Sequence, residues 1–213
     1  MKLYSYFRSS GAYRVRIALN LKNIAYETAS VHLVKDGGHN RRPEFRAVNS
    51  QMRIPALVAP TGDVLIQSLA IIEYLDETHP EPPLVPKDPI ARARARALAH
   101  IVACDIHPLN NLRVLKYLSN ELGVPEEERD RWYAHWIREG LPALEALAAP
   151  RSGAFLFGDG PTMADVCLVP QLYNARRFDV PLDDYPTLLR AEANANKLDA
   201  FAAAHPDRQE VPA

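Results

Sequence analysis

The first eighty residues alternate two patterns of polar and apolar positions. Stretches in which the two kinds of residue alternate predict strands, and stretches with apolar residues three or four positions apart predict helices. Pro60-Thr61-Gly62-Asp63 has the composition of a tight turn, and the short apolar runs on either side of it predict a hairpin. In order, the pattern predicts a strand over 2–7, a helix over 14–22, a strand over 26–33, hairpin strands over 55–58 and 64–66, and a helix over 68–78.

A proline-rich segment separates this part from the rest of the chain. Five prolines fall between residues 80 and 89, and no helix continues through that density of proline. Beyond it strand patterns nearly vanish, and Thr162 stands three residues before Asp165, a spacing typical of a helix start. Helices are predicted over 92–118, 125–148, 162–176 and 186–203. We therefore expect an α/β domain over 1–80, a linker over 81–87 and an all-helical domain over 88–213.

Composition narrows the classes of function. The chain is 47% hydrophobic and 24% charged with a formal net charge of −1, so no overall field favours a nucleic acid or an anionic membrane as partner. No apolar run approaches the roughly 20 residues of a membrane span. Cys104 and Cys167 form no CxxC pair, which favours a reducing, cytoplasmic setting. His100 and His107 share a helix face without a third ligand, so we expect no metal site.

The stretch Ser9-Ser10-Gly11 places two hydroxyls and unpaired backbone N–H groups at the start of a helix. The longer stretch SSGAYRVRIALNLK resembles the opening motif of the zeta-class glutathione transferases. The segments QSLAIIEYL, DIHPLNNLRVLKYL, TMADVCLVPQ and NARRF are similar to that class too, so the resemblance covers nearly the whole chain. It implies a thioredoxin-like N-terminal domain, an all-helical glutathione-transferase C-terminal domain and a homodimer.

The resemblance also implies an activity. It points to a glutathione-dependent cis–trans isomerase that converts the dicarboxylate maleylacetoacetate to fumarylacetoacetate in tyrosine and phenylalanine catabolism. Isomerisation of maleylpyruvate in gentisate catabolism, a general zeta-class transferase and a noncatalytic interaction module of the same fold stay open. The serine pair, Gln67-Ser68 and Arg177 favour an enzyme, because a scaffold has no need of them.

The residues expected to bind glutathione lie mostly in the first domain. A helix start stabilises a thiolate, and the Ser10 hydroxyl, ahead of that of Ser9, is expected to donate to the sulfur. Without the resemblance, a serine that only caps the helix is the simpler interpretation. Gly11 stands where the class motif often has cysteine, so we expect glutathione itself to supply the thiolate. The other contacts that the resemblance implies are Ile54 before a cis Pro55, Gln67, Ser68, His39, Asn40, His107 and Asn111.

The two carboxylates of the substrate require cationic donors. By motif alignment Arg177 is the substrate-side arginine, and Arg14 stands one turn into the first helix. A solvated arginine on a helix face is as common as a functional one, so each candidate depends on the motif for support. The expected catalytic residues are Ser9, Ser10, Arg14 and Arg177, and the expected substrate-binding residues are Arg8, Arg14, Arg113, Arg176 and Arg177.

Overall fold

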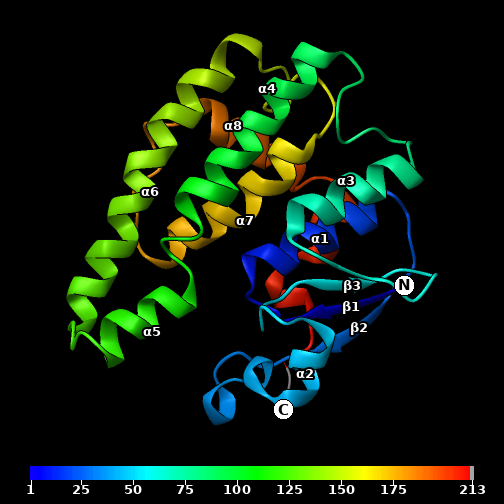
Figure 1. Ribbon diagram of the computed structural model, residues 1–213. Coiled ribbons are helices and arrows are strands. Elements are labelled where there is room, and N and C mark those ends of the chain that lie inside the picture. Colours follow the sequence, from blue (N-terminus) through cyan, green and yellow to red (C-terminus); the bar gives the residue numbers. More distant parts are fainter. Residues whose placement is uncertain (212–213) are drawn as a thin grey trace. The chain divides into compact units, whose positions relative to one another are not determined.

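The computed structural model describes residues 1–211, which divide into two compact units (Figure 1). Unit 1 comprises Met1–Leu84 together with the segment from Asn196 onward, and unit 2 comprises Val85–Ala195. The fold class expected from the sequence is confirmed, since one unit combines a sheet with helices and the other is helical. None of the helices within 1–211 has the length and apolar character needed to cross a bilayer.

Unit 1 is built on a four-stranded sheet in the order β2-β1-β3-β4. β1 pairs with β2 in parallel and with β3 in antiparallel fashion, and β3 and β4 form the predicted antiparallel hairpin. Leu3 lies opposite Leu57, and both side chains are buried. Helices α1 and α3 lie on one face of the sheet (Figure 1). The bounds are β1 Lys2–Ser5, β2 Glu27–Ser30, β3 Ala56–Val58, β4 Val64–Ile66, α1 Ser10–Leu21, α2 Pro43–Val48 and α3 Ser68–Thr78, with 3-10 turns at Lys35–Gly37 and His39–Arg41.

The end of the chain packs in unit 1, which differs from the predicted domain boundary. The predicted helix over 186–203 is broken into α8 (Pro186–Ala195) and α9 (Asp199–Ala204). Helix α9 packs against α1, where Phe201 and Ala204 are fully buried. Because α1 is buried along ten of its twelve residues, it needs cover on more than the sheet side, and α9 provides it.

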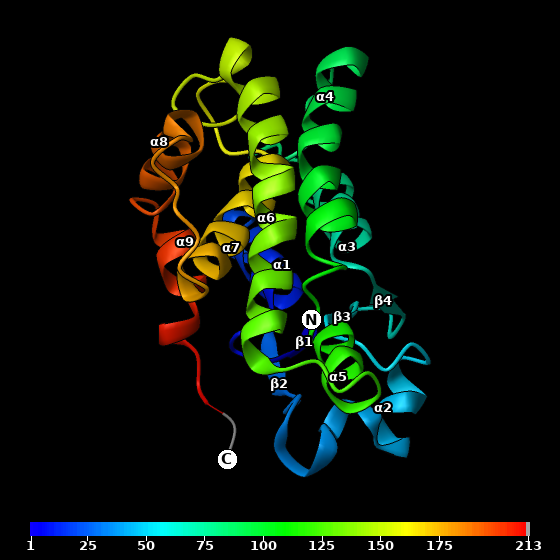
Figure 2. The same ribbon diagram turned by 90° about the vertical axis from the view of Figure 1, so that its left-hand side faces the viewer.

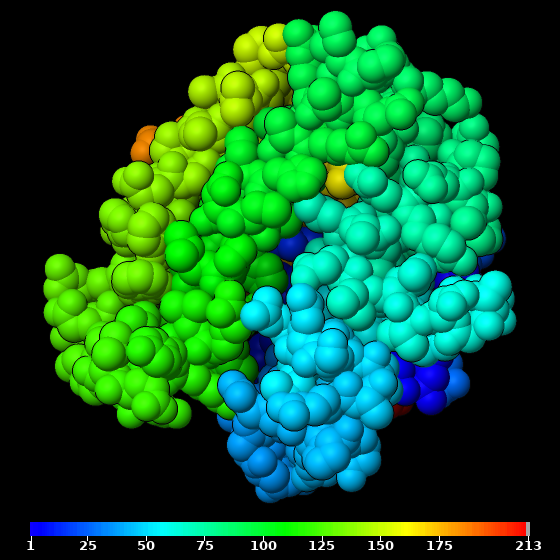
Figure 3. Space-filling view, in the orientation of Figure 1, coloured from blue at the N-terminus to red at the C-terminus, as the bar shows by residue number. Residues whose placement is uncertain are grey.

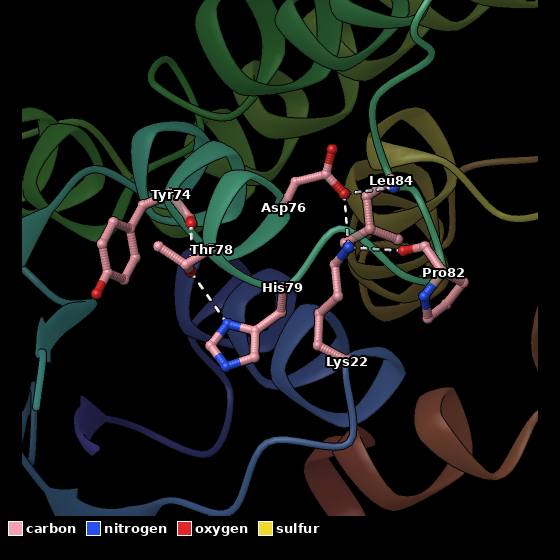
Figure 4. A network of polar contacts seen from close by, with 7 residues as sticks. All are labelled: Lys22, Tyr74, Asp76, Thr78, His79, Pro82 and Leu84. Carbon is pink, nitrogen blue, oxygen red and sulfur yellow. Dashed lines mark hydrogen bonds and ion pairs between the residues drawn. The ribbon is translucent and has the colours of Figure 1, made fainter.

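Lys22 at the end of α1 holds the beginning of the linker on unit 1 (Figure 4). Its buried Nζ donates to Asp76 Oδ1 at 2.6 Å and to the Pro82 carbonyl oxygen at 2.6 Å. The Leu84 N–H donates to the same carboxylate oxygen at 2.7 Å. A buried charged pair is stable only when its remaining hydrogen-bonding capacity is also used, as it is here. Residues up to Leu84 therefore belong to unit 1.

Unit 2 is organised around α7, whose residues are mostly buried. In Figure 2, α4 and α6 run beside each other, and α7 packs against α4 and α8. The predicted start of α7 is confirmed: Thr162 Oγ1 accepts from Ala164 N at 3.3 Å, and Asp165 Oδ2 accepts from Thr162 N at 2.8 Å. The bounds are α4 Pro89–His100, a π-helix Ile101–Ile106, α5 Leu112–Asn120, α6 Glu126–Ala148, α7 Met163–Arg177 and α8 Pro186–Ala195, with a 3-10 turn at Ala149–Arg151; another, Pro206–Arg208, lies in unit 1.

The single helix predicted over 92–118 is two helices. Helix α4 passes into the π-helix and a turn, and α5 begins afresh at Leu112. Pro108 lies in that turn, where its missing N–H and its ring interrupt the helical ladder. Asn111 then caps α5, since its Oδ1 accepts from Arg113 N at 3.1 Å.

Candidate functional site

The start of α1 places hydrogen-bond donors around one point of unit 1. Ser9 is the N-cap, with its Oγ accepting from Ala12 N at 3.3 Å. Ser10 is the first helical residue and is 7% exposed. The buried N–H of Gly11 has no acceptor among residues 1–211. A buried donor at a helix N-terminus suits an anion, and the Ser9 hydroxyl hydrogen is still available because Oγ bonds Ala12 as an acceptor.

The start of α3 offers a second set of donors in the same unit. Gln67, the N-cap, has φ = 70°, a region that residues other than glycine seldom adopt. Neither a side chain nor a backbone carbonyl within 1–211 accepts from the N–H groups of Ser68 and Leu69. Backbone strain of this kind occurs at ligand sites, and the uncapped helix start suits a carboxylate.

Arg14 connects the two helix starts. Its side chain is 1% exposed, and Nη1 donates to Ser68 Oγ at 3.4 Å. The sequence predicts that Arg14 reaches the substrate, and the structure places its guanidinium at the start of α3. Arg8, by contrast, is exposed, with its guanidinium 4.8 Å from the Phe7 ring centre. Arg14 therefore positions Ser68.

The backbone of Ile54, also in unit 1, lacks hydrogen-bond partners among residues 1–211. The Ile54–Pro55 peptide bond is cis, as the resemblance implies. Within the described part of the chain, neither the N–H nor the carbonyl group of Ile54 forms a hydrogen bond. Strand β3 begins two residues later, at Ala56. The Ile54 backbone is thus available to pair with an extended peptide in the manner of an added strand.

Two asparagines shape the turn before Ile54, and sequence reasoning missed one of them. Asn49 is buried; its Nδ2 donates to Arg53 O at 2.6 Å and its Oδ1 accepts from Gln51 N at 3.0 Å. Asn40, a predicted contact, donates from Nδ2 to Met52 O at 2.8 Å. The signal that could have identified Asn49 is its place at the head of a polar turn, since asparagine side chains bond nearby backbone in turns.

Sequence reasoning also missed Gln51. Its Oε1 accepts from Gln67 Nε2 at 3.0 Å, which ties the turn before Ile54 to the start of α3. The two residues are sixteen positions apart, and nothing in the local pattern relates them.

His39 lies in a surface segment of unit 1, residues 35–48, coloured blue to cyan in Figure 3. Its Nε2 lies 3.2 Å from Asp36 Oδ2, and Arg42 Nη2 lies 3.0 Å from the same oxygen. The hydrogen bond with His39, followed by the charge of Arg42, holds the pKa of Asp36 below its usual range. His39 therefore helps to fix the fold of this segment.

The predicted site residues of unit 2 lie either between the π-helix and α5 or at the end of α7. His107 caps the end of the π-helix, with its backbone N–H donating to Val102 O at 2.9 Å, whereas Asn111 caps the start of α5 and Arg113 lies in its first turn. Arg113 is exposed. Over residues 1–211 no three His, Cys, Asp or Glu side chains gather in a metal-binding arrangement.

The adjacent arginines at the end of α7 have different partners. Arg176 pairs with Glu192 of α8 through two hydrogen bonds of 2.6 and 2.5 Å, and the Glu192 side chain is only 8% exposed. Arg177 is exposed, and its guanidinium lies 5.9 Å from the Tyr173 ring centre and 5.6 Å from that of Phe178. Within 1–211 it donates no hydrogen bond, so Arg177 has donors to offer a ligand, whereas those of Arg176 hold α7 to α8.

Comparison with known proteins adds independent information. Residues 3–83 match the model of the glutathione S-transferase N-terminal domain, and residues 126–194 match that of the C-terminal domain. A probable maleylacetoacetate isomerase of Vibrio cholerae is 50% identical over 208 residues, which span 97% of this chain and 96% of that protein.

Two solved structures are also similar over their full lengths. One, a maleyl pyruvate isomerase described as a bacterial glutathione S-transferase of the zeta class, is 48% identical with a TM-score of 0.95 and full coverage of both chains. The other, a maleylacetoacetate isomerase of Methylobacterium extorquens, holds malonate and glutathione; it is 43% identical, with a TM-score of 0.95 and full coverage of both chains.

Proposed function

Because the chain belongs to the glutathione S-transferase family, in its zeta class, we propose that it is a glutathione-dependent isomerase that converts maleylacetoacetate to fumarylacetoacetate. The observation that carries the proposal is the pair of helix starts in unit 1. Both α1 and α3 begin with N–H groups for which residues 1–211 provide no acceptor, and Arg14, in α1, donates to Ser68 at the start of α3. Two such anion sites in one unit fit a ligand that carries a thiolate at one point and a carboxylate at another.

Residues of unit 1 are proposed to bind glutathione along its whole length. The start of α3 would receive the γ-glutamyl carboxylate, with Gln67 and Ser68 beside it. The unpaired Ile54 backbone would pair with the cysteinyl backbone, and the start of α1 would receive the sulfur. His39 and Asn40 shape the segment proposed to hold the glycyl end.

When bound, glutathione supplies the thiolate that adds to the activated double bond and departs after rotation about the resulting single bond. The task of this chain's residues is to keep that sulfur ionised and to bind the substrate's carboxylates. Two observations support Ser9 ahead of Ser10 as the hydroxyl donor to sulfur. The Ser9 hydroxyl hydrogen is available although Oγ caps the helix, and Ser9 is the more exposed of the two residues. Gly11 N–H would provide a second donor.

Arg177 is proposed to bind a carboxylate of the substrate. It is exposed and donates no hydrogen bond within 1–211, and its guanidinium lies near the rings of Tyr173 and Phe178. A guanidinium binds a carboxylate through two parallel hydrogen bonds, which fixes both the position and the orientation of the substrate.

We propose that the active species is a cytoplasmic homodimer with one glutathione site per subunit. The starts of α1 and α3 belong to the same unit of one chain, so no second chain is needed to bring them together. Sedimentation at micromolar concentration should give twice the monomer mass of 23.8 kDa, and a monomer would contradict the proposal.

Maleylpyruvate is the second candidate substrate, favoured by the 48% identity to the maleyl pyruvate isomerase structure. The test uses purified protein with saturating glutathione and compares kcat/KM for the two cis acids. Conversion of maleylacetoacetate at the higher kcat/KM supports the first proposal. A higher kcat/KM for maleylpyruvate would make maleylpyruvate the preferred substrate. If neither acid is converted, the proposed isomerase activity is refuted.

A further inference from the structure

Arg16 is a charged residue in the core of unit 1. It lies in α1 among apolar neighbours, and it is 0% exposed. Its guanidinium donates to four acceptors, none of them a carboxylate. These are Ser5 Oγ at 3.0 Å, Tyr6 O at 3.4 Å, Phe7 O at 3.0 Å and Ala204 O at 3.0 Å.

The positive charge of Arg16 is not neutralised by a neighbouring anion within the described part of the chain. Its ionisable neighbours are the phenols of Tyr13 and Tyr26, and the Tyr13 ring centre lies 5.2 Å from the guanidinium. Burial raises the pKa of Tyr26 above its usual value and lowers that of Arg16 to about 10, so Arg16 remains charged near neutral pH. A buried guanidinium without a carboxylate partner is costly, and its retention calls for a reason.

Two hydrogen bonds of Arg16 go to backbone carbonyls just before the start of α1. The Tyr6 carbonyl oxygen that accepts from Arg16 also accepts from Ser9 N at 2.9 Å. The Phe7 carbonyl, one residue nearer to Ser9, accepts from the other terminal nitrogen. Arg16 therefore holds the turn before Ser9 and places its positive charge beside the carbonyl groups of that turn.

The same guanidinium anchors the end of the chain. Its Nε donates to Ala204 O in α9, 188 residues away in sequence. A second hydrogen bond joins the two helices, from Asn20 Nδ2 to Ala200 O at 2.9 Å, without reaching the turn before Ser9. The chain thus offers two comparable contacts between α1 and α9, and only the residue that makes the first, Arg16, also bonds the turn before Ser9.

We propose that Arg16 is a positioning residue for thiol activation: it holds Ser9 through the Tyr6 and Phe7 carbonyls and stabilises the thiolate of bound glutathione by its charge. The inference rests on the proposed function, because it concerns the sulfur of glutathione at the start of α1. It assigns a role to an arginine that contacts neither glutathione nor substrate.

The test measures the pKa of the glutathione thiol bound to the full-length protein, from the ultraviolet absorbance of the thiolate as pH is varied. Arg16→Met removes the charge and the donors, whereas Arg16→Lys keeps the charge and loses the planar set of donors. We expect Arg16→Met to raise the thiol pKa by about one unit, since nearby cations and helix starts lower a thiol pKa by that much or more. Arg16→Lys should recover part of the shift.

Asn20→Ala is the control, because it removes a different hydrogen bond between α1 and α9. It should leave the thiol pKa unchanged, and an equal rise in this variant would overturn the assignment to Arg16. Ser5→Ala removes only one acceptor of the guanidinium and decides the matter if neither Arg16 variant folds. A smaller rise in thiol pKa supports the proposal in that case, and none contradicts it.

The two hypotheses fail in different ways. If the wild-type protein binds no glutathione, or binds it without lowering the thiol pKa, the proposed function is refuted. If the wild-type protein lowers the thiol pKa and folded Arg16 variants lower it equally, only the role of Arg16 is refuted.

Discussion

Replacing Ser9 by glycine and by alanine separates its capping role from its proposed role at the sulfur. Both substitutions remove the hydroxyl, but they differ in what they do to α1. Glycine is itself a good N-cap, so Ser9→Gly should cost only a few tenths of a kcal/mol in the free energy of unfolding, whereas Ser9→Ala should cost about 1 kcal/mol. The capping bond to Ala12 N is long, at 3.3 Å, which places the alanine value toward the low end.

Activity should respond differently from stability. A hydrogen bond to a charged group contributes about 1.5–3 kcal/mol, so both Ser9 variants should lose turnover roughly tenfold to a hundredfold near neutral pH. Because the lost bond favours the thiolate, part of the activity should return as pH is raised above the thiol pKa. The assay is a pH–rate profile with chemical denaturation of each variant beside it. Ser10→Ala is the matched control and should retain most of its turnover. Full activity in Ser9→Gly would show that Ser9 only caps the helix, and would return Ser10 to first place.

Three further predictions concern unit 2. Arg177→Ala should lower kcat/KM for the dicarboxylate tenfold or more with little change in glutathione affinity, and the defect should persist at high pH because no group near neutrality titrates in that contact. Arg176→Met leaves the buried Glu192 carboxylate without its partner, so denaturation should show a loss of about 1–3 kcal/mol while turnover of the folded protein stays unchanged. Burial raises the pKa of Asp165 to about 6, above its ordinary 3.8, against the hydrogen bonds from Leu156 and Thr162. The folded protein therefore favours the protonated carboxyl, and this contribution to stability is fully present below pH 3.8 and lost as pH rises through 6. The Asp165→Asn variant should lack this fall in the free energy of unfolding with rising pH.

Much of the fold was predictable because its signals are local. The hairpin over β3 and β4, the bounds of α3 and the capping box of Thr162 and Asp165 each depend on residues within a few positions of one another. The two errors in helix length have a similar origin. Apolar spacing continues through the π-helix near Pro108 and through the gap between α8 and α9, and spacing alone does not reveal such breaks.

The sequence nominates candidate site residues, but the contacts that several of them make depend on residues far away in the sequence. Arg14 and Arg176 are arginines on helices, and their partners, Ser68 and Glu192, are 54 and 16 residues away in sequence. Only the folded chain shows that one positions Ser68 and the other joins two helices. Arg16 carried a visible signal, since a charge in the middle of an apolar helix face requires buried partners, but those partners include α9 at the far end of the chain.

The most direct test of the account is the fate of glutathione during turnover. Purified protein is given the cis dicarboxylate with and without glutathione, and both the trans product and the free thiol are followed over many turnovers. The account predicts that product forms only when glutathione is present and that the thiol concentration stays constant throughout. Isomerisation without glutathione would contradict the proposed roles of both helix starts, and steady loss of thiol would show a conjugating transferase instead of an isomerase.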